Sequence, residues 1–89
     1  MKAIITVLGK DQVGIIAGVS SLLAKWNVNV LDISQTILQE NFTMVMLVDT
    51  AACTASIGEM ADLLEQAGKE QELSIRIQRE DIFNAMHRI

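Results

Sequence analysis

The chain has 89 residues, of which 51% are apolar, and it contains no proline. This length suffices for one compact domain and is too short for two, and so small and apolar a domain has apolar surface left for a partner, so we expect a homo-oligomer. The formal net charge of -4 and the aromatic fraction of 3% disfavour nucleic-acid binding, which needs a basic face and stacking rings.

Other classes are excluded by what the sequence lacks. No run approaches the roughly 18 consecutive apolar residues of a membrane span, and the seven Lys and Arg residues are scattered, so no membrane partner is expected. The N-terminus has no signal-peptide pattern, which predicts a cytoplasmic protein. A single cysteine, Cys53, and a single histidine allow no internal disulfide and no recognisable metal site, and we expect no cofactor.

The first predicted elements are a strand and a helix. Residues 3–8 are β-branched and apolar on nearly both faces, which predicts a central strand. Over residues 13–26 the apolar positions recur at helical spacing. Asp11 is well placed to cap the start of this helix, and Asn27 follows its last apolar position, where a residue that tolerates left-handed geometry ends a helix.

A hairpin follows. Residues 28–39 alternate and predict a strand with one wetter face, carrying Val30, Asp32 and Ser34, while Ile33 and Ile37 lie on the other face. Residues 42–48 predict the second strand, which is apolar on both faces. We therefore expect the sheet face turned away from the helices to meet another chain.

The last elements are a helix, a strand and a short tail. An apolar stripe over residues 57–67 predicts a helix capped by Ser56 or Thr54, with Gly68 near its end. Residues 73–78 predict a half-exposed strand. Asp81 is placed to cap a short final helix that must dock its apolar stripe on its own sheet or on a neighbour. That stripe consists of Ile82, Phe83, Met86 and Ile89.

Strand, helix, strand, strand, helix, strand form two βαβ units within a single domain over residues 1–89. Right-handed crossovers arrange such units as a ferredoxin-like βαββαβ fold of the α+β class. The prediction is a four-stranded antiparallel sheet with both helices on one face and a short C-terminal helix.

The loop between the first strand and the first helix is the candidate site. A helix start leaves backbone N–H groups free at a positive end, which suits an anionic group. An amino acid would fit: its carboxylate would take the amides of Val13, Gly14 or Ile15, and its ammonium would take Asp11. Capping and ligand contact by Asp11 both stay open, because a carboxylate has lone pairs for two partners.

Residues 9–15, the Leu22-Leu23 helix end and residues 27–35 together resemble an ACT domain, most closely the small stand-alone ACT proteins, and residues 82–86 resemble that subgroup too. The resemblance covers essentially the whole chain. It implies a regulatory module that binds a small molecule, typically an amino acid, between two copies, in a dimer or a dimer of dimers. Asp11 and Gly14 match ligand-contacting positions of the first loop, and Asn29 matches an asparagine that reaches across from the partner subunit. Serine-sensing relatives tend to carry asparagine where this chain has Asp11, so the charge implies another ligand preference or a vestigial site.

Two alternatives come from other classes. The chain could be an interaction module that regulates a partner protein without any small ligand. An acylphosphatase-like enzyme on the same fold would need a cationic phosphate cradle, and the first loop offers only Lys10. Nucleotide binding through a P-loop is disfavoured because Ile15 and Ile16 stand where Lys and Ser or Thr are needed. We therefore expect a protein that is not an enzyme.

Overall fold

The computed structural model describes residues 1–10 and 14–81. Six elements follow one another in the described chain: β1 (Lys2–Lys10), α1 (Ile15–Lys25), β2 (Asn29–Leu38), β3 (Asn41–Asp49), α2 (Ile57–Glu70) and β4 (Leu73–Arg79). All four predicted strands are present. Their ends differ from the predicted ranges by one or two residues.

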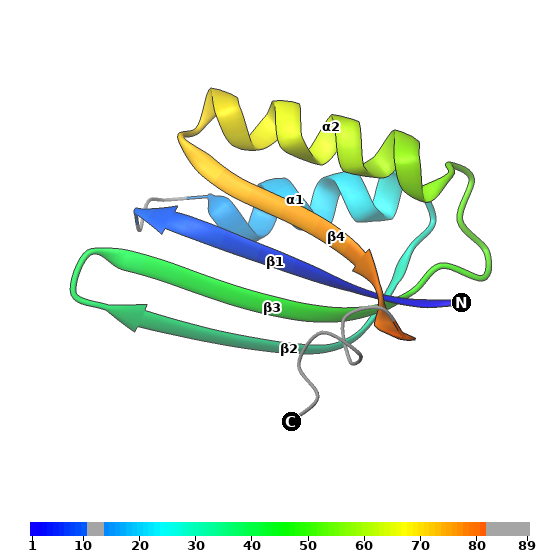
Figure 1. The fold of residues 1–89 in the computed structure, drawn as a ribbon, viewed down its shortest axis with the longest axis horizontal. Helices are drawn as coiled ribbons and strands as arrows, with labels where there is room; N and C mark the ends of the chain where they lie inside the picture. The colour runs from blue at the N-terminus through cyan, green and yellow to red at the C-terminus, as the bar shows by residue number, and fades with distance from the viewer. Residues whose placement is uncertain (11–13, 82–89) are drawn as a thin grey trace.

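The four strands form one sheet in the order β2-β3-β1-β4, and every neighbouring pair is antiparallel. Both helices lie on the same side of this sheet, with β2 and β4 at its two edges (Figure 1). The ferredoxin-like prediction is confirmed, including the central place of β1, whose apolar side chains on both faces need neighbours on both sides.

The core lies between the sheet and the helices. On the strands it is built by alternate residues, such as Ile5 of β1 and Met46 of β3, because successive side chains point to opposite faces. Leu23 of α1 and Leu64 of α2 meet them from the helical layer, and both are almost completely buried. Trp26, the only tryptophan, closes the end of this core next to α1.

The first helix is shorter than its pattern predicted. It begins at Ile15 rather than near Val13, which lies outside the described residues, and Trp26 is its C-cap. Asn27 has φ 59°, so the prediction of a left-handed residue after the helix is confirmed. Its side-chain amide donates to the carbonyl of Ala52 at 3.1 Å, which ties the helix end to the β3–α2 connection.

The two faces of β2 differ from the prediction. The register between β2 and β3 shifts between Val30 and Asp32, which makes Leu31 an extra residue, a β-bulge. Val30 therefore shares the helix side of the sheet with Ile33 and Ile37, whereas the sequence alternation had placed it with Asp32. The prediction that one face of β2 is wetter than the other is also wrong, because every residue of this strand is exposed.

The start of α2 follows its sequence signature. Ser56 is the N-cap, and its hydroxyl accepts from the Glu59 backbone N–H at 3.2 Å. The alternative cap, Thr54, instead bonds through its own N–H to the Trp26 carbonyl at 3.0 Å. The helix continues two residues past Gly68, where a Cβ atom would lie 2.6 Å from the Leu73 carbonyl oxygen. Gly68 thus permits close contact between α2 and β4 rather than ending the helix.

The last described strand, β4, alternates as predicted, with Leu73, Ile75 and Ile77 buried. Beyond it, Asp81 accepts from the Arg79 guanidinium at 2.8 Å. The rest of the predicted C-terminal helix, residues 82–89, lies outside the described residues. Of the helices in the described part of the chain, none is long and apolar enough to cross a membrane.

Candidate functional site

The loop after β1 ends at Gly14, which is exposed and has φ 89° and ψ 4°. Residues with a Cβ atom adopt this left-handed conformation at a cost, so the position favours glycine. A Cβ atom built on Gly14 would meet no atom of residues 1–10 or 14–81 within 4 Å. The backbone angle therefore accounts for the glycine, since no described residue crowds it.

Gly14 is also the N-cap of α1. Its carbonyl accepts from the Gly18 N–H at 2.9 Å, which closes the first helical turn. Glycine has no side chain to accept from the amides of that turn, and the turn contains no acidic residue. The first amides of α1 thus retain the positive character of a helix start, which attracts a carboxylate or another anion.

Ile15 was predicted to offer its backbone amide to the site. Its side chain is buried in the core, which fixes the direction of the first helical turn. Two other predicted site residues, Asp11 and Val13, lie outside the described residues, so their contacts stay predictions. Lys10, the basic residue beside them, is exposed at the end of β1 and is paired with Asn41 of β3.

Asn29 lies far from this loop within one chain. It is the first residue of β2 and is paired with Asp49, which is itself paired with Lys2 at the start of β1. Gly14 follows the other end of β1, and a strand of 9 residues spans about 27 Å. The fold therefore separates Asn29 from Gly14 by the length of the sheet.

The sequence interpretation missed the apolar surface at the β2 edge. Val30, Ile33 and Ile37 lie on the helix side of the sheet, yet Ile37 is 53% exposed, and Leu38 at the strand end is 70% exposed. The βαββαβ order itself places β2 at an edge, so topology is the signal that predicts this exposure. The bulge at Leu31 had no signal in the alternation pattern.

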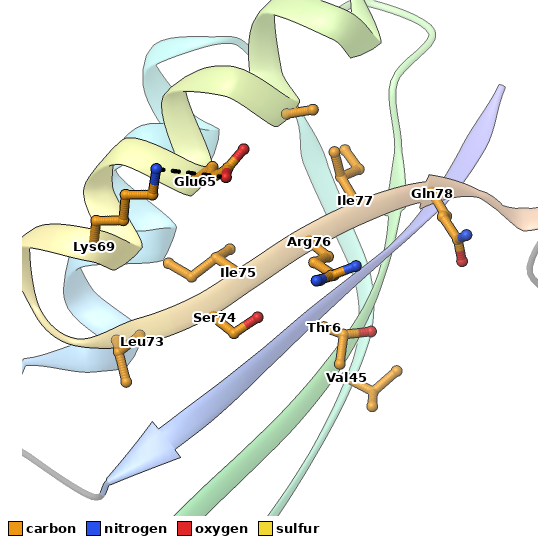
Figure 2. Close-up of a pocket in the computed structure, with 11 residues that line it drawn as sticks. Thr6, Val45, Glu65, Lys69, Leu73, Ser74, Ile75, Arg76, Ile77 and Gln78 are labelled. Atoms are coloured by element: carbon orange, nitrogen blue, oxygen red, sulfur yellow. Dashed lines mark ion pairs between the residues drawn. The ribbon is translucent and has the colours of Figure 1, made fainter.

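A groove of about 900 Å³ runs along the opposite edge, around β4. Figure 2 shows that its side chains come from α2, β4, β1 and β3, with the Glu65–Lys69 pair beside Ile75 and the Arg76 guanidinium near Thr6. The ion pair is long, 3.7 Å, and both of its side chains are largely exposed. Of the predicted site residues that the structure describes, none lines the groove. Its strand-borne polar residues Thr6, Ser74, Arg76 and Gln78 share the sheet face away from the helices, whereas Glu65 and Lys69 come from α2.

The fold is that of a ferredoxin-like α+β domain, with β2 as an edge strand of its sheet. The family model of the ACT domain matches residues 2–78, and the chain belongs to this family. A UPF0237 protein of Clostridium acetobutylicum is 57% identical over the full length of both chains.

Solved structures agree with this assignment. An ACT domain protein from Streptococcus pneumoniae superposes with a TM-score of 0.82 at 43% identity, covering 93% of each chain. A formyltetrahydrofolate deformylase from Pseudomonas syringae shares the fold, with a TM-score of 0.80 at 21% identity over 88% of this chain and 27% of that one. ACT domains are regulatory modules that commonly bind small ligands such as amino acids and that oligomerise.

Proposed function

We propose that two copies of the chain pair along their β2 strands and bind an amino acid between them. Each of the two sites would combine the α1 start of one copy, around Gly14, with Asn29 of the other. The observation that carries this proposal is the exposed apolar β2 edge, together with the separation of Gly14 and Asn29 within one chain.

The β2 edge favours a second copy as its partner. An edge strand presents unpaired N–H and C=O groups, and this one adds exposed apolar side chains such as Ile33 and Ile37. A like strand of opposite direction satisfies both at once, and two-fold pairing buries the same patch on each copy. In such a pair, the start of one β2 lies beside the end of the other. Asn29 of one copy would thereby approach the end of the sheet where the other copy has its Gly14 loop.

The chemistry of the loop favours a zwitterion. The amides at the start of α1 suit a carboxylate, and Asp11 adds a negative charge that suits an ammonium group. A purely anionic ligand would be repelled by Asp11. The side-chain amide of Asn29 can both donate and accept, so it suits either end of the ligand. This role is regulatory and not catalytic, and the cytoplasmic location stays a prediction.

Calorimetry against the twenty amino acids tests the ligand. One of them should bind, and at a hundred times its dissociation constant it should add about 2.7 kcal/mol to the free energy of unfolding. Asp11→Ala should weaken that binding, whereas Asp62→Ala, which removes an exposed carboxylate from α2, should not. Unchanged affinity of Asp11→Ala would remove this residue from the site.

Mixing two inactive variants tests whether the site is shared. Asp11→Ala and Asn29→Ala should each lose binding alone, because each damages both sites of a pair. A mixed pair keeps one intact site, made of the unaltered loop of one copy and the unaltered Asn29 of the other. Binding should therefore return on mixing, with one ligand for each mixed pair. No recovery on mixing would place both residues in the same chain's site and contradict the proposal.

The exposed β2 edge also favours a second candidate, an assembly module without a ligand, because apolar pairing along β2 needs no small molecule. Stable dimers by light scattering, with no thermal shift from any of the twenty amino acids, would favour this candidate. Thermal shift and light scattering together thus distinguish a ligand-binding dimer from an assembly module without a ligand.

A further inference from the structure

The face of the sheet away from the helices, here called the open face, is covered unevenly. Its side chains from β1 include Ile4 and Leu8, which alternate with core residues. Ile4 is only 9% exposed, although it faces away from both helices, whereas Leu8 at the other end of the strand is 46% exposed. The two ends of the open face thus differ in how well they are protected from water.

The protected end contains a shallow hollow of about 130 Å³. Ile4, Val45 and Leu47 supply apolar side chains from β1 and β3, and Asp32 and Ser34 line it from β2. Ile4 and Leu47 are direct partners across the β1–β3 ladder, so their side chains lie side by side. This apolar hollow with one carboxylate at its border suits an apolar segment that carries a positive charge.

The chain leaves the sheet beside this hollow. In the β1–β4 ladder Ile4 is paired with Gln78 and Ala3 with Arg79, the last residue of β4. Residues 82–89 follow after only two more residues. Their sequence spaces four apolar side chains along one helical face and adds one arginine: Ile82, Phe83, Met86, Ile89 and Arg88.

We propose that residues 82–89 dock on the open face of their own chain, with the apolar stripe over Ile4 and Leu47. Eight residues in helical form extend about 12 Å. Crossing from β4 over β1 to β3 requires about 10 Å, since neighbouring strands lie about 4.8 Å apart. The segment is long enough to reach Leu47 and too short to cover Leu8 at the far end. Arg88 and Asp32 carry opposite charges, which favours this direction of docking.

This docking assigns separate roles to two surfaces. The open face would be closed by the chain itself, which leaves the β2 edge as the surface for a second copy. The inference does not rest on the proposed ligand site and stands if no amino acid binds. A second chain on the open face, as the sequence pattern predicts, is the competing outcome.

Paired substitutions in the full chain test the contact. Phe83→Ala should lower the urea midpoint of unfolding, read from the fluorescence of Trp26. Leu47→Ala should lower it as well, and the double variant should fall clearly less than the sum of the two shifts, because both remove the same contact. Leu8→Ala is the matched control on the uncovered end, and its shift should add to that of Phe83→Ala. Additive shifts for Leu47→Ala and Phe83→Ala would overturn the proposal.

A cross-link distinguishes the chain's own segment from that of a neighbour. In a Cys53→Ser background, Leu47→Cys and Met86→Cys introduce one thiol on the hollow and one on the segment. Mild oxidation should give a disulfide within one chain, seen as a monomer of increased mobility on a non-reducing gel. A disulfide between chains would replace the proposal by exchange between copies, and the absence of any disulfide would contradict the docking itself.

Discussion

The two helices of this domain begin in opposite ways. At the start of α2, the Ser56 hydroxyl accepts from the Glu59 N–H, and the Glu59 carboxylate adds a negative charge to the first turn. At the start of α1, the N-cap is Gly14 in a left-handed conformation, and the first turn has no acidic residue. One start is completed by its own side chains, whereas at the other the N-cap residue has no side chain that could accept from the first amides.

This difference suits the α2 start to stabilising the fold and the α1 start to the proposed ligand binding. The α2 start has its hydrogen bonds and its charge supplied from within, so it contributes to folding and has little left for a ligand. The α1 start has glycine at its N-cap, which gives up a few tenths of a kcal/mol relative to a serine cap. Under the proposed function, this helix start leaves its amides available for the carboxylate of the ligand.

The same substitution in the two first turns should have opposite effects. Gly14→Ala should lower the free energy of unfolding by about 1–2 kcal/mol, because its φ of 89° is left-handed. Gly58→Ala should raise it by up to about 1 kcal/mol, because the residue lies in α2 and an added Cβ would lie an ordinary 3.9 Å from the Ser56 hydroxyl oxygen. Urea denaturation followed by Trp26 fluorescence measures both. Equal changes in the free energy of unfolding would contradict the claim that Gly14, but not Gly58, is required by its backbone conformation.

Removing the α2 cap should affect stability alone. Ser56→Ala should lower the free energy of unfolding by about 1 kcal/mol, since the Glu59 amide loses its acceptor. Ligand affinity, measured by calorimetry, should not change. Ser20→Ala, on the exposed face of α1, is the control and should leave stability nearly unchanged. A loss of affinity in Ser56→Ala would show that the two helix starts are not independent.

The smallest effect concerns the charge in the first turn of α2. Glu59→Gln should lower the free energy of unfolding by about 0.5 kcal/mol at low salt, because a carboxylate favours the positive helix end. The difference should shrink in 1 M salt, where exposed charges are screened. A difference that persists at high salt would instead assign the effect to the hydrogen bond between the Ser56 hydroxyl and the Glu59 carboxylate.

Most of the fold is predictable because it rests on local patterns. Alternation identifies β3 and β4, helical spacing identifies both helices, and Ser56 with Glu59 identifies the start of α2. The order of elements then fixes the sheet through right-handed crossovers. Gly68 lies near the end of α2 as predicted, but the reason for a glycine there is its close approach to Leu73, a tertiary contact that no local pattern encodes.

The candidate site was less predictable. Gly14 follows from its place between strand and helix, and its left-handed backbone agrees with the requirement for a glycine. The β2 faces were assigned wrongly because one additional residue at the Leu31 bulge reverses every later side chain, and alternation cannot reveal where such a residue lies. The proposed site lies between two chains, and the pattern of a single sequence does not show which residues of a second copy lie nearby.

The bulge at Leu31 also bears on how a further strand can add to the β2 edge. A sheet with two open edges, β2 and β4, could add copies without end, which is the geometry of a fibril. The bulge interrupts the regular ladder near the start of β2, and the exposed Asp32 places a charge just after it. An added strand can pair regularly only along the part of β2 from Asp32 to Leu38. The irregular register and the charge of Asp32 therefore disfavour regular extension of the sheet along the first part of this edge.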